Sequence, residues 1–207
     1  MKRRIICKFW EVVIAGFCIL AYSCMPLHAQ VEEGAPAGKN PSAHFYLGPG
    51  MGIDSPTGII GLSVEAPIVK KFSAFGGAGI GFWGLKLAAG FNYYFKEAPL
   101  GSSVGVSYSF STGDKNLELL MPVEPLSENE MITVNLLPAG SISLFYSHSW
   151  TLGKKGKFTL FTGYAVSLNK SPWEVVSNHT LDDISVMTLD LLKPGGIMLG
   201  MQFMLGI

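Results

Sequence analysis

The stretch FSAFGGAGIGFW at residues 72–83 decides the fold. Its even positions, from Phe72 to Phe82, are apolar or very small, and its odd positions are mostly serine and glycine. A period of two residues is that of a β-strand, whose successive side chains point to opposite faces. A strand with one apolar face and one face of small residues is typical of a barrel that meets lipid outside and fills a narrow lumen inside. The stretch therefore predicts a membrane-spanning strand.

The same alternation recurs along the chain. In residues 102–111, for example, Val104, Val106, Tyr108 and Phe110 alternate with serines and a glycine. We count eight such segments and expect strands over about 44–53, 57–68, 72–83, 85–95, 102–111, 139–150, 157–168 and 196–207. The predicted fold is all-β, a single antiparallel up-and-down transmembrane β-barrel of about eight strands, covering residues 43–207.

The predicted connections alternate between two ends of this barrel. The segments 68–71, 96–101 and 152–156 are short and share one end with both termini. The other end carries two short turns, at 54–56 and 83–84, and two long connections, at about 112–131 and 169–195. Short turns on one side and long loops on the other are the asymmetry of outer-membrane barrels, whose long loops are extracellular.

Two other folds were weighed against the membrane barrel. A soluble β-sandwich or lipocalin-like barrel also alternates, but it hides its apolar face and exposes charge. Here the face opposite the apolar one is made of Gly, Ser and Ala, and only 14% of all residues are charged, against about 25% usually. A membrane helix over 72–95 is the second alternative, and its six glycines and strict alternation argue against it.

The N-terminus carries the pattern of a secretory signal peptide over residues 1–29. A basic start is followed by a short apolar core at 12–20, and cleavage is predicted between Ala29 and Gln30. All three cysteines lie in this segment, so the exported chain would hold none. A retained anchor, or a lipoprotein with Cys24 lipidated, are the alternatives. Residues 30–42, rich in Gly and Pro, are predicted to be a flexible lead-in.

Composition and motifs give little sign of catalysis. The formal net charge is zero, so nothing indicates nucleic acid as a partner. The histidines are scattered without metal-ligand spacing, and we expect no metal and no cofactor. Residues 79–84, GIGFWG, match a dinucleotide-binding pattern, but they lead into another alternating strand rather than a helix.

Several polar residues fall on the predicted inner face and are assigned structural roles. Glu65 and Lys157 could pair across the lumen, or each could reach water at a barrel mouth. A barrel of eight strands is filled by side chains, which argues against a general porin despite the porin-like fold. The inward polar residues are His44, Glu65, Lys86, Asn92, Lys157 and Gln202.

His148 raises one enzyme hypothesis, because some small outer-membrane barrels are lipid A hydrolases with a His–Ser arrangement on the lipid-facing wall. Its neighbour Ser149 must point to the opposite face of the strand, so the two cannot form such a pair. We therefore expect an interfacial residue and no catalytic residues.

The long connections are the best candidates for recognition, since loops on a rigid scaffold carry function. Both are acidic, and neither has calcium-loop spacing. The runs 117–121 and 184–187 are apolar and could extend strands beyond the membrane. For the remaining residues of the two long connections we expect a solvated acidic rim.

From these features the chain resembles the small outer-membrane β-barrel proteins common in Bacteroidetes, over about residues 43–207. The resemblance rests on the Ala29-Gln30 end, on the Tyr46-Leu47-Gly48-Pro49-Gly50 first strand and on the Gly/Ser-lined alternation. Ile207 departs from the pattern, because many such proteins end in an aromatic residue; Phe203 shares its outward face.

The resemblance implies an outer-membrane location, with outer-membrane lipid and the barrel-assembly machinery as partners. It implies a non-enzymatic, envelope-structural or surface-interaction role, with an unknown extracellular partner possible through the long loops. The alternatives are a lipid-modifying outer-membrane enzyme and a soluble periplasmic β-domain that binds an apolar ligand.

Overall fold

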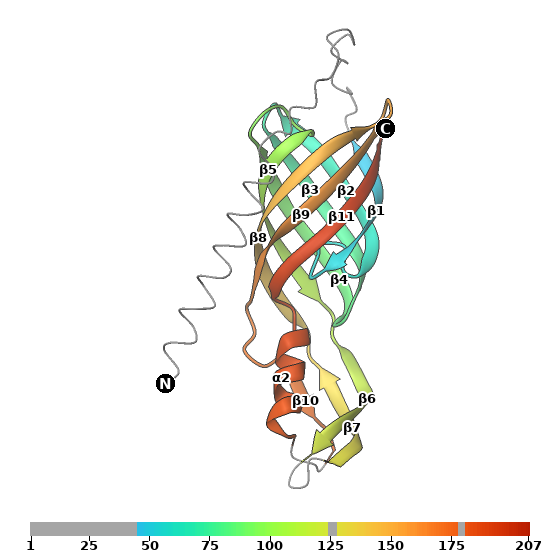
Figure 1. Ribbon diagram of the computed structural model, residues 1–207, viewed down its shortest axis with the longest axis vertical. Coiled ribbons are helices and arrows are strands. Elements are labelled where there is room, and N and C mark those ends of the chain that lie inside the picture. Colours follow the sequence, from blue (N-terminus) through green and yellow to red (C-terminus); the bar gives the residue numbers. More distant parts are fainter. Residues whose placement is uncertain (1–44, 124–127, 178–180) are drawn as a thin grey trace, which may run out of the picture. The chain divides into compact units, whose positions relative to one another are not determined.

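The computed structural model describes residues 45–207, with gaps at 124–127 and 178–180. The predicted signal peptide, the cleavage site at Ala29-Gln30, the lead-in and His44 lie outside these residues. Within them the fold is all-β: a closed antiparallel up-and-down barrel of eight strands, a three-stranded sheet and one short helix (Figure 1).

The barrel closes in the order β1-β11-β9-β8-β5-β4-β3-β2. The first and last strands meet antiparallel, with Tyr46 opposite Gly206, so the barrel has no free edge. All eight predicted strands are confirmed, each within three residues of its expected bounds. The strands are β1 (Tyr46–Ile53), β2 (Ile60–Val69), β3 (Phe72–Gly81), β4 (Gly84–Tyr94), β5 (Gly101–Ser111), β8 (Ala139–Leu152), β9 (Gly156–Ser167) and β11 (Gly196–Gly206).

The two faces of the barrel wall differ as the alternation predicts. Large apolar side chains such as Leu87, Val106 and Leu144 are exposed on the outer face. The inner face is lined by serines that hydrogen-bond across neighbouring strands, with oxygen–oxygen distances of 2.6 to 2.8 Å. These cross-strand pairs are Ser103–Ser147, Ser109–Ser141 and Ser149–Thr159.

A cluster of large apolar side chains fills the middle of the lumen. Phe145 lies between Phe75 and Phe161, with ring centroids 5.7 and 6.1 Å away, and Met198 completes the cluster. Each comes from a different strand and is buried. The lumen is therefore a packed core.

The connection between β1 and β2 folds into the barrel instead of forming the short outer turn predicted at 54–56. Ser55 and Thr57 are fully buried, and Ser55 Oγ donates to the carbonyl of Gly58 at 2.6 Å. Glycines of β3 make the space: a Cβ on Gly79 would lie 2.0 Å from the Thr57 carbonyl oxygen. Small residues on the inner face of β3 thus admit backbone, not only side chains, into the lumen.

Both long connections leave the barrel at the end opposite its C-terminus, as predicted (Figure 1). Their acidic side chains, such as Glu118, Glu174 and Asp183, are exposed as expected of a solvated rim, but the sequence did not predict that these connections form a folded unit. They fold into a sheet of order β10-β7-β6 and a helix, and we call this unit the cap. Its elements are β6 (Asp114–Val123), β7 (Glu128–Leu136), β10 (Trp173–Val175) and α2 (Asp183–Leu192).

The apolar run 184–187 was considered as a strand extension, and this interpretation is wrong, because the run lies in α2. Asp182 caps this helix: its side chain accepts from the backbone N–H of Asp183. Ser185 and Leu189, four residues apart, face the cap core. The run 117–121 does lie in a strand, β6. Over the described residues, α2 included, no helix has the length and apolar character needed to cross a membrane.

Candidate functional site

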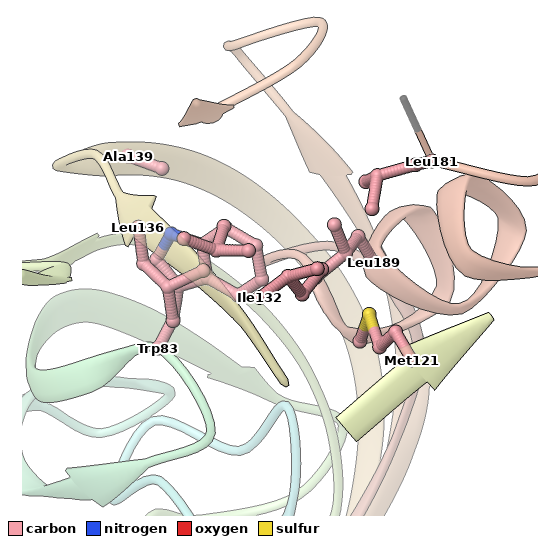
Figure 2. Close-up of a cluster of buried hydrophobic side chains, with 8 residues drawn as sticks. Trp83, Met121, Ile132, Leu136, Ala139, Leu181 and Leu189 are labelled. Atoms are coloured by element: carbon pink, nitrogen blue, oxygen red, sulfur yellow. The ribbon is translucent and has the colours of Figure 1, made fainter. Parts of the chain in front are cut away.

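The cap and the barrel rim share one hydrophobic core, shown in Figure 2. Trp83, from the β3–β4 turn, and Ala139, at the start of β8, belong to the barrel. Trp83 donates its indole N–H to the carbonyl oxygen of Leu137 at 3.0 Å. The cap supplies Met121, Ile132, Val134, Leu136, Leu181 and Leu189. Because the rim residues are buried in this core, the cap packs directly against the barrel rim and is not joined to it by flexible linkers alone.

Backbone contacts join the two long connections into one cap. The segment around Pro172 adds to β7, with the N–H of Leu137 donating to the Pro172 carbonyl at 2.7 Å. On the other side, Ser185 at the start of α2 donates its hydroxyl to the carbonyl of Pro122 in β6 at 2.8 Å. Segments from both connections therefore hold each other in place.

The outer surface of the cap combines negative charge with an apolar stripe. Residues 112–138 and 168–195 together hold nine acidic residues against three lysines. On α2, the exposed side chains of Ile184, Met187 and Leu191 lie at spacings of three and four residues, on the face away from Leu189. This combination is suited to contact with another molecule.

The predicted inward residues Glu65 and Lys157 form a buried ion pair near the short-turn end of the barrel. Glu65 Oε1 also accepts from Ser73 Oγ and Tyr94 Oη, at 2.5 Å each, and from Asn92 Nδ2 at 3.4 Å. Of the two arrangements that the sequence allowed, the structure has the ion pair between Glu65 and Lys157. The sequence did not identify Ser73 and Tyr94 as partners of the Glu65 carboxylate.

The Lys157 ammonium also lies 5.2 Å from the centroid of the Tyr46 ring. Gln202 is buried in the same region and lines a small lumen cavity together with Glu65 and Asn92. Lys86, the last of the inward set, lies apart from them near the cap and pairs with Asp54. The lumen therefore has a buried ion pair toward each end.

His148 has a hydrogen-bond partner that the sequence did not indicate. Ser102 lies opposite it in the β5–β8 register, and Ser102 Oγ is 2.9 Å from His148 Nδ1. Tyr146 Oη donates to the same hydroxyl at 2.8 Å, while Ser149 is buried in the lumen. The hydrogen bonds at His148 and Ser102 therefore join a serine, a histidine and a tyrosine.

The described residues contain no cluster of three or more His, Cys, Asp or Glu side chains that could hold a metal ion. Comparisons of the chain with protein-family models, with curated proteins and with solved structures found no match. The class that this structure defines is a closed eight-stranded up-and-down β-barrel, with side chains packed in its lumen and a cap at one end.

Proposed function

We propose that this protein is a non-enzymatic outer-membrane β-barrel that presents its cap to a partner outside the cell. The observation that carries the proposal is the inversion of the barrel wall, with bulky apolar side chains exposed outside and polar ones buried inside. In water such a continuous apolar surface would drive aggregation, whereas in a bilayer it is matched to its surroundings.

The dimensions of the barrel support this location. Strands β4, β5 and β11 have 11 residues each. At a tilt of roughly 40° such strands rise about 28 Å along the barrel axis. The apolar band of outer-membrane barrels is about 25 Å tall.

Aromatic side chains gather near the short-turn end, as at a membrane interface. Tyr93 lies between Phe72 and Phe95, with centroid distances of 5.0 and 6.1 Å. Trp150, Phe158 and Phe203 form a second row, with distances of 5.7 and 4.6 Å. Girdles of this kind mark the interfaces of transmembrane barrels.

The filled lumen favours an envelope-structural or surface-interaction role over transport. Aromatic rings, two ion pairs and the inserted β1–β2 connection occupy the interior. Outside the lumen, the cap is a folded platform on a rigid scaffold, which suits recognition. The predicted signal peptide supports export, and the barrel-assembly machinery and outer-membrane lipid are the partners this route requires.

Fractionation of cells that express the protein tests this proposal. We expect recovery with outer membranes, and a gel band that shifts when the unheated sample is boiled. A protease site inserted between β6 and β7 should be cut in intact cells, and the same site inserted at residues 153–155 should not. Recovery in the soluble periplasm would instead favour the β-domain that binds an apolar ligand.

A lipid-modifying enzyme is the second candidate, and the Ser102–His148 hydrogen bond is the one observation that favours it. Lipid A and phospholipid mass spectra from a deletion strain test it. The enzyme hypothesis survives only if a lipid modification disappears on deletion and His148→Ala fails to restore it.

A further inference from the structure

A cavity of about 350 Å³ lies where the cap meets the barrel. Its lining comes from four separate segments: the β1–β2 connection, the β3–β4 turn with the start of β4, the end of β5, and the segment from Leu191 to Ile197. The volume falls in the range of small-molecule sites. At about 30 Å³ for a water-sized group, it holds about a dozen non-hydrogen atoms.

The cavity has apolar walls. Ile53, Ile59 and Phe82 contribute from the barrel rim, Leu191 and Leu192 from the end of α2, and Ile197 from the start of β11. These side chains are 39–77% exposed, so the cavity is open to its surroundings, and a hydrocarbon body would cover apolar surface that the protein leaves exposed.

The polar side chains of the lining centre on the ion pair between Lys86 and Asp54. Lys86 Nζ donates to Asp54 Oδ1 and, at 3.1 Å, to the Asp54 carbonyl, which accounts for two of its three N–H groups. Asp54 Oδ2 is buried and has no hydrogen-bond partner among the residues that the structure describes. Asp54 also has a φ of 47°, a left-handed conformation that costs energy for a residue other than glycine.

A buried acceptor without a partner is costly, and a donor brought by a ligand would remove that cost. The ion pair as a whole is neutral, and Lys193, the other charged residue of the lining, is paired with Asp190. The lining therefore offers one free acceptor and one free donor without net charge. A ligand head with its own full charge would be buried beside this pair without a counter-charge, which is unfavourable. An uncharged head that both donates and accepts, such as an amide, fits.

We propose that this cavity binds a single-chain amphiphile of about a dozen non-hydrogen atoms, whose uncharged head hydrogen-bonds Asp54 and Lys86. The site goes beyond the proposed surface role, because it depends on the cavity and not on any partner of the cap.

Three ten-carbon probes that differ only in their heads test the proposal: decanamide, decanoate and decylammonium. The reporter is the indole N–H signal of Trp83 in a protein labelled with ¹⁵N-tryptophan and held in lipid nanodiscs. Trp83 lines the cavity, whereas Trp150 and Trp173 do not. We expect decanamide to shift the Trp83 signal saturably, with a Kd at least about tenfold below those of the two charged probes.

Charge-removing variants give a sharper outcome. Asp54→Asn leaves the Lys86 cation unpaired, so the preference should change to decanoate. Lys86→Met leaves the Asp54 anion unpaired, so the preference should change to decylammonium. Glu118→Gln removes a negative charge from β6, outside the cavity lining, and should keep the preference for decanamide.

A fourth variant, Ser111→Leu, fills the cavity from its buried lining and should weaken all three probes. Heat-modifiability of each variant shows whether the barrel is folded. Equal binding of the three probes, no saturable change at Trp83, or an unchanged preference in folded Asp54→Asn and Lys86→Met would each overturn the proposal.

Discussion

Lys157 and Glu65, 92 positions apart in the sequence, form an ion pair inside the barrel although their strands, β9 and β2, are not neighbours in the sheet. The pair therefore spans the lumen. Both side chains are buried, and the carboxylate has three further hydrogen bonds, from Ser73, Tyr94 and Asn92. This geometry links, through charge, two strands of the wall that β1 and β11 separate.

Removing one partner of this pair should destabilise the barrel strongly. Lys157→Met leaves the Glu65 carboxylate buried without its counter-charge, and we expect a loss of about 3–5 kcal/mol in the free energy of unfolding. Urea unfolding of the refolded protein, followed by tryptophan fluorescence, measures it. Lys193→Met breaks the exposed pair with Asp190 and should cost less than about 1 kcal/mol. Equal losses in the two variants would contradict this account.

Substituting a glycine of β3 should destabilise the barrel to an extent that depends on the atoms that face that glycine. Gly79→Ala places a methyl group against the Thr57 carbonyl and should destabilise by about 1–3 kcal/mol. Gly76→Ala is the matched control, because its nearest neighbour would be a Val64 methyl group at 3.5 Å, an ordinary contact. Unfolding midpoints of the two variants give the comparison. A loss in Gly76→Ala as large as in Gly79→Ala would show that the inserted connection is not the cause.

Trp83 should hold the cap more than the barrel. Trp83→Ala removes the indole from the core that the cap and the barrel rim share. The cavity left behind should lower the free energy of unfolding by about 3–5 kcal/mol. We expect limited proteolysis to cut the cap of this variant while the barrel fragment resists. Trp83→Phe keeps most of the packing and loses the hydrogen bond to the Leu137 carbonyl, about 1 kcal/mol, so its cap should stay resistant. A cap that is equally protected in Trp83→Ala would contradict the shared core.

The proposed membrane location predicts a difference between two leucines with the same exposed fraction. Leu144 in β8 and Leu120 in β6 are each 63% exposed. Leu144→Lys puts a charge near the middle of the barrel wall and should cost about 2–4 kcal/mol in a bilayer. Leu120→Lys, on the cap, should change stability by less than about 0.5 kcal/mol. Unfolding from lipid vesicles measures both, and a small effect at Leu144 would argue for a barrel in water.

The barrel could be predicted from the sequence because its signal is local. Each strand shows its two faces within about ten residues, as Leu85 to Phe95 does, and the lengths of the connections then assign the ends. The Glu65–Lys157 pair was foreseen as one of two arrangements, since both residues were assigned to the inner face near one end. Which of the two arrangements forms depends on how the side chains pack in the lumen. The alternation of apolar and small residues does not encode that packing.

The rest depended on contacts between distant segments. The partnership of Ser102 with His148 follows from the register of β5 against β8. The insertion of Ser55 and Thr57 follows from the space left by glycines one strand away. The apolar run at 184–187 suited a strand as well as a helix, and the capping residue Asp182 and the buried spacing of Ser185 and Leu189 were the signals that could have identified α2.

The inserted β1–β2 connection has a consequence for protein engineering. This segment belongs to the barrel and occupies the lumen. Shortening or replacing residues 112–138 and 168–195 would therefore leave the lumen filled and would not open a channel. The barrel is therefore a scaffold with a filled lumen, on which other binding segments could be displayed without opening a passage through its interior.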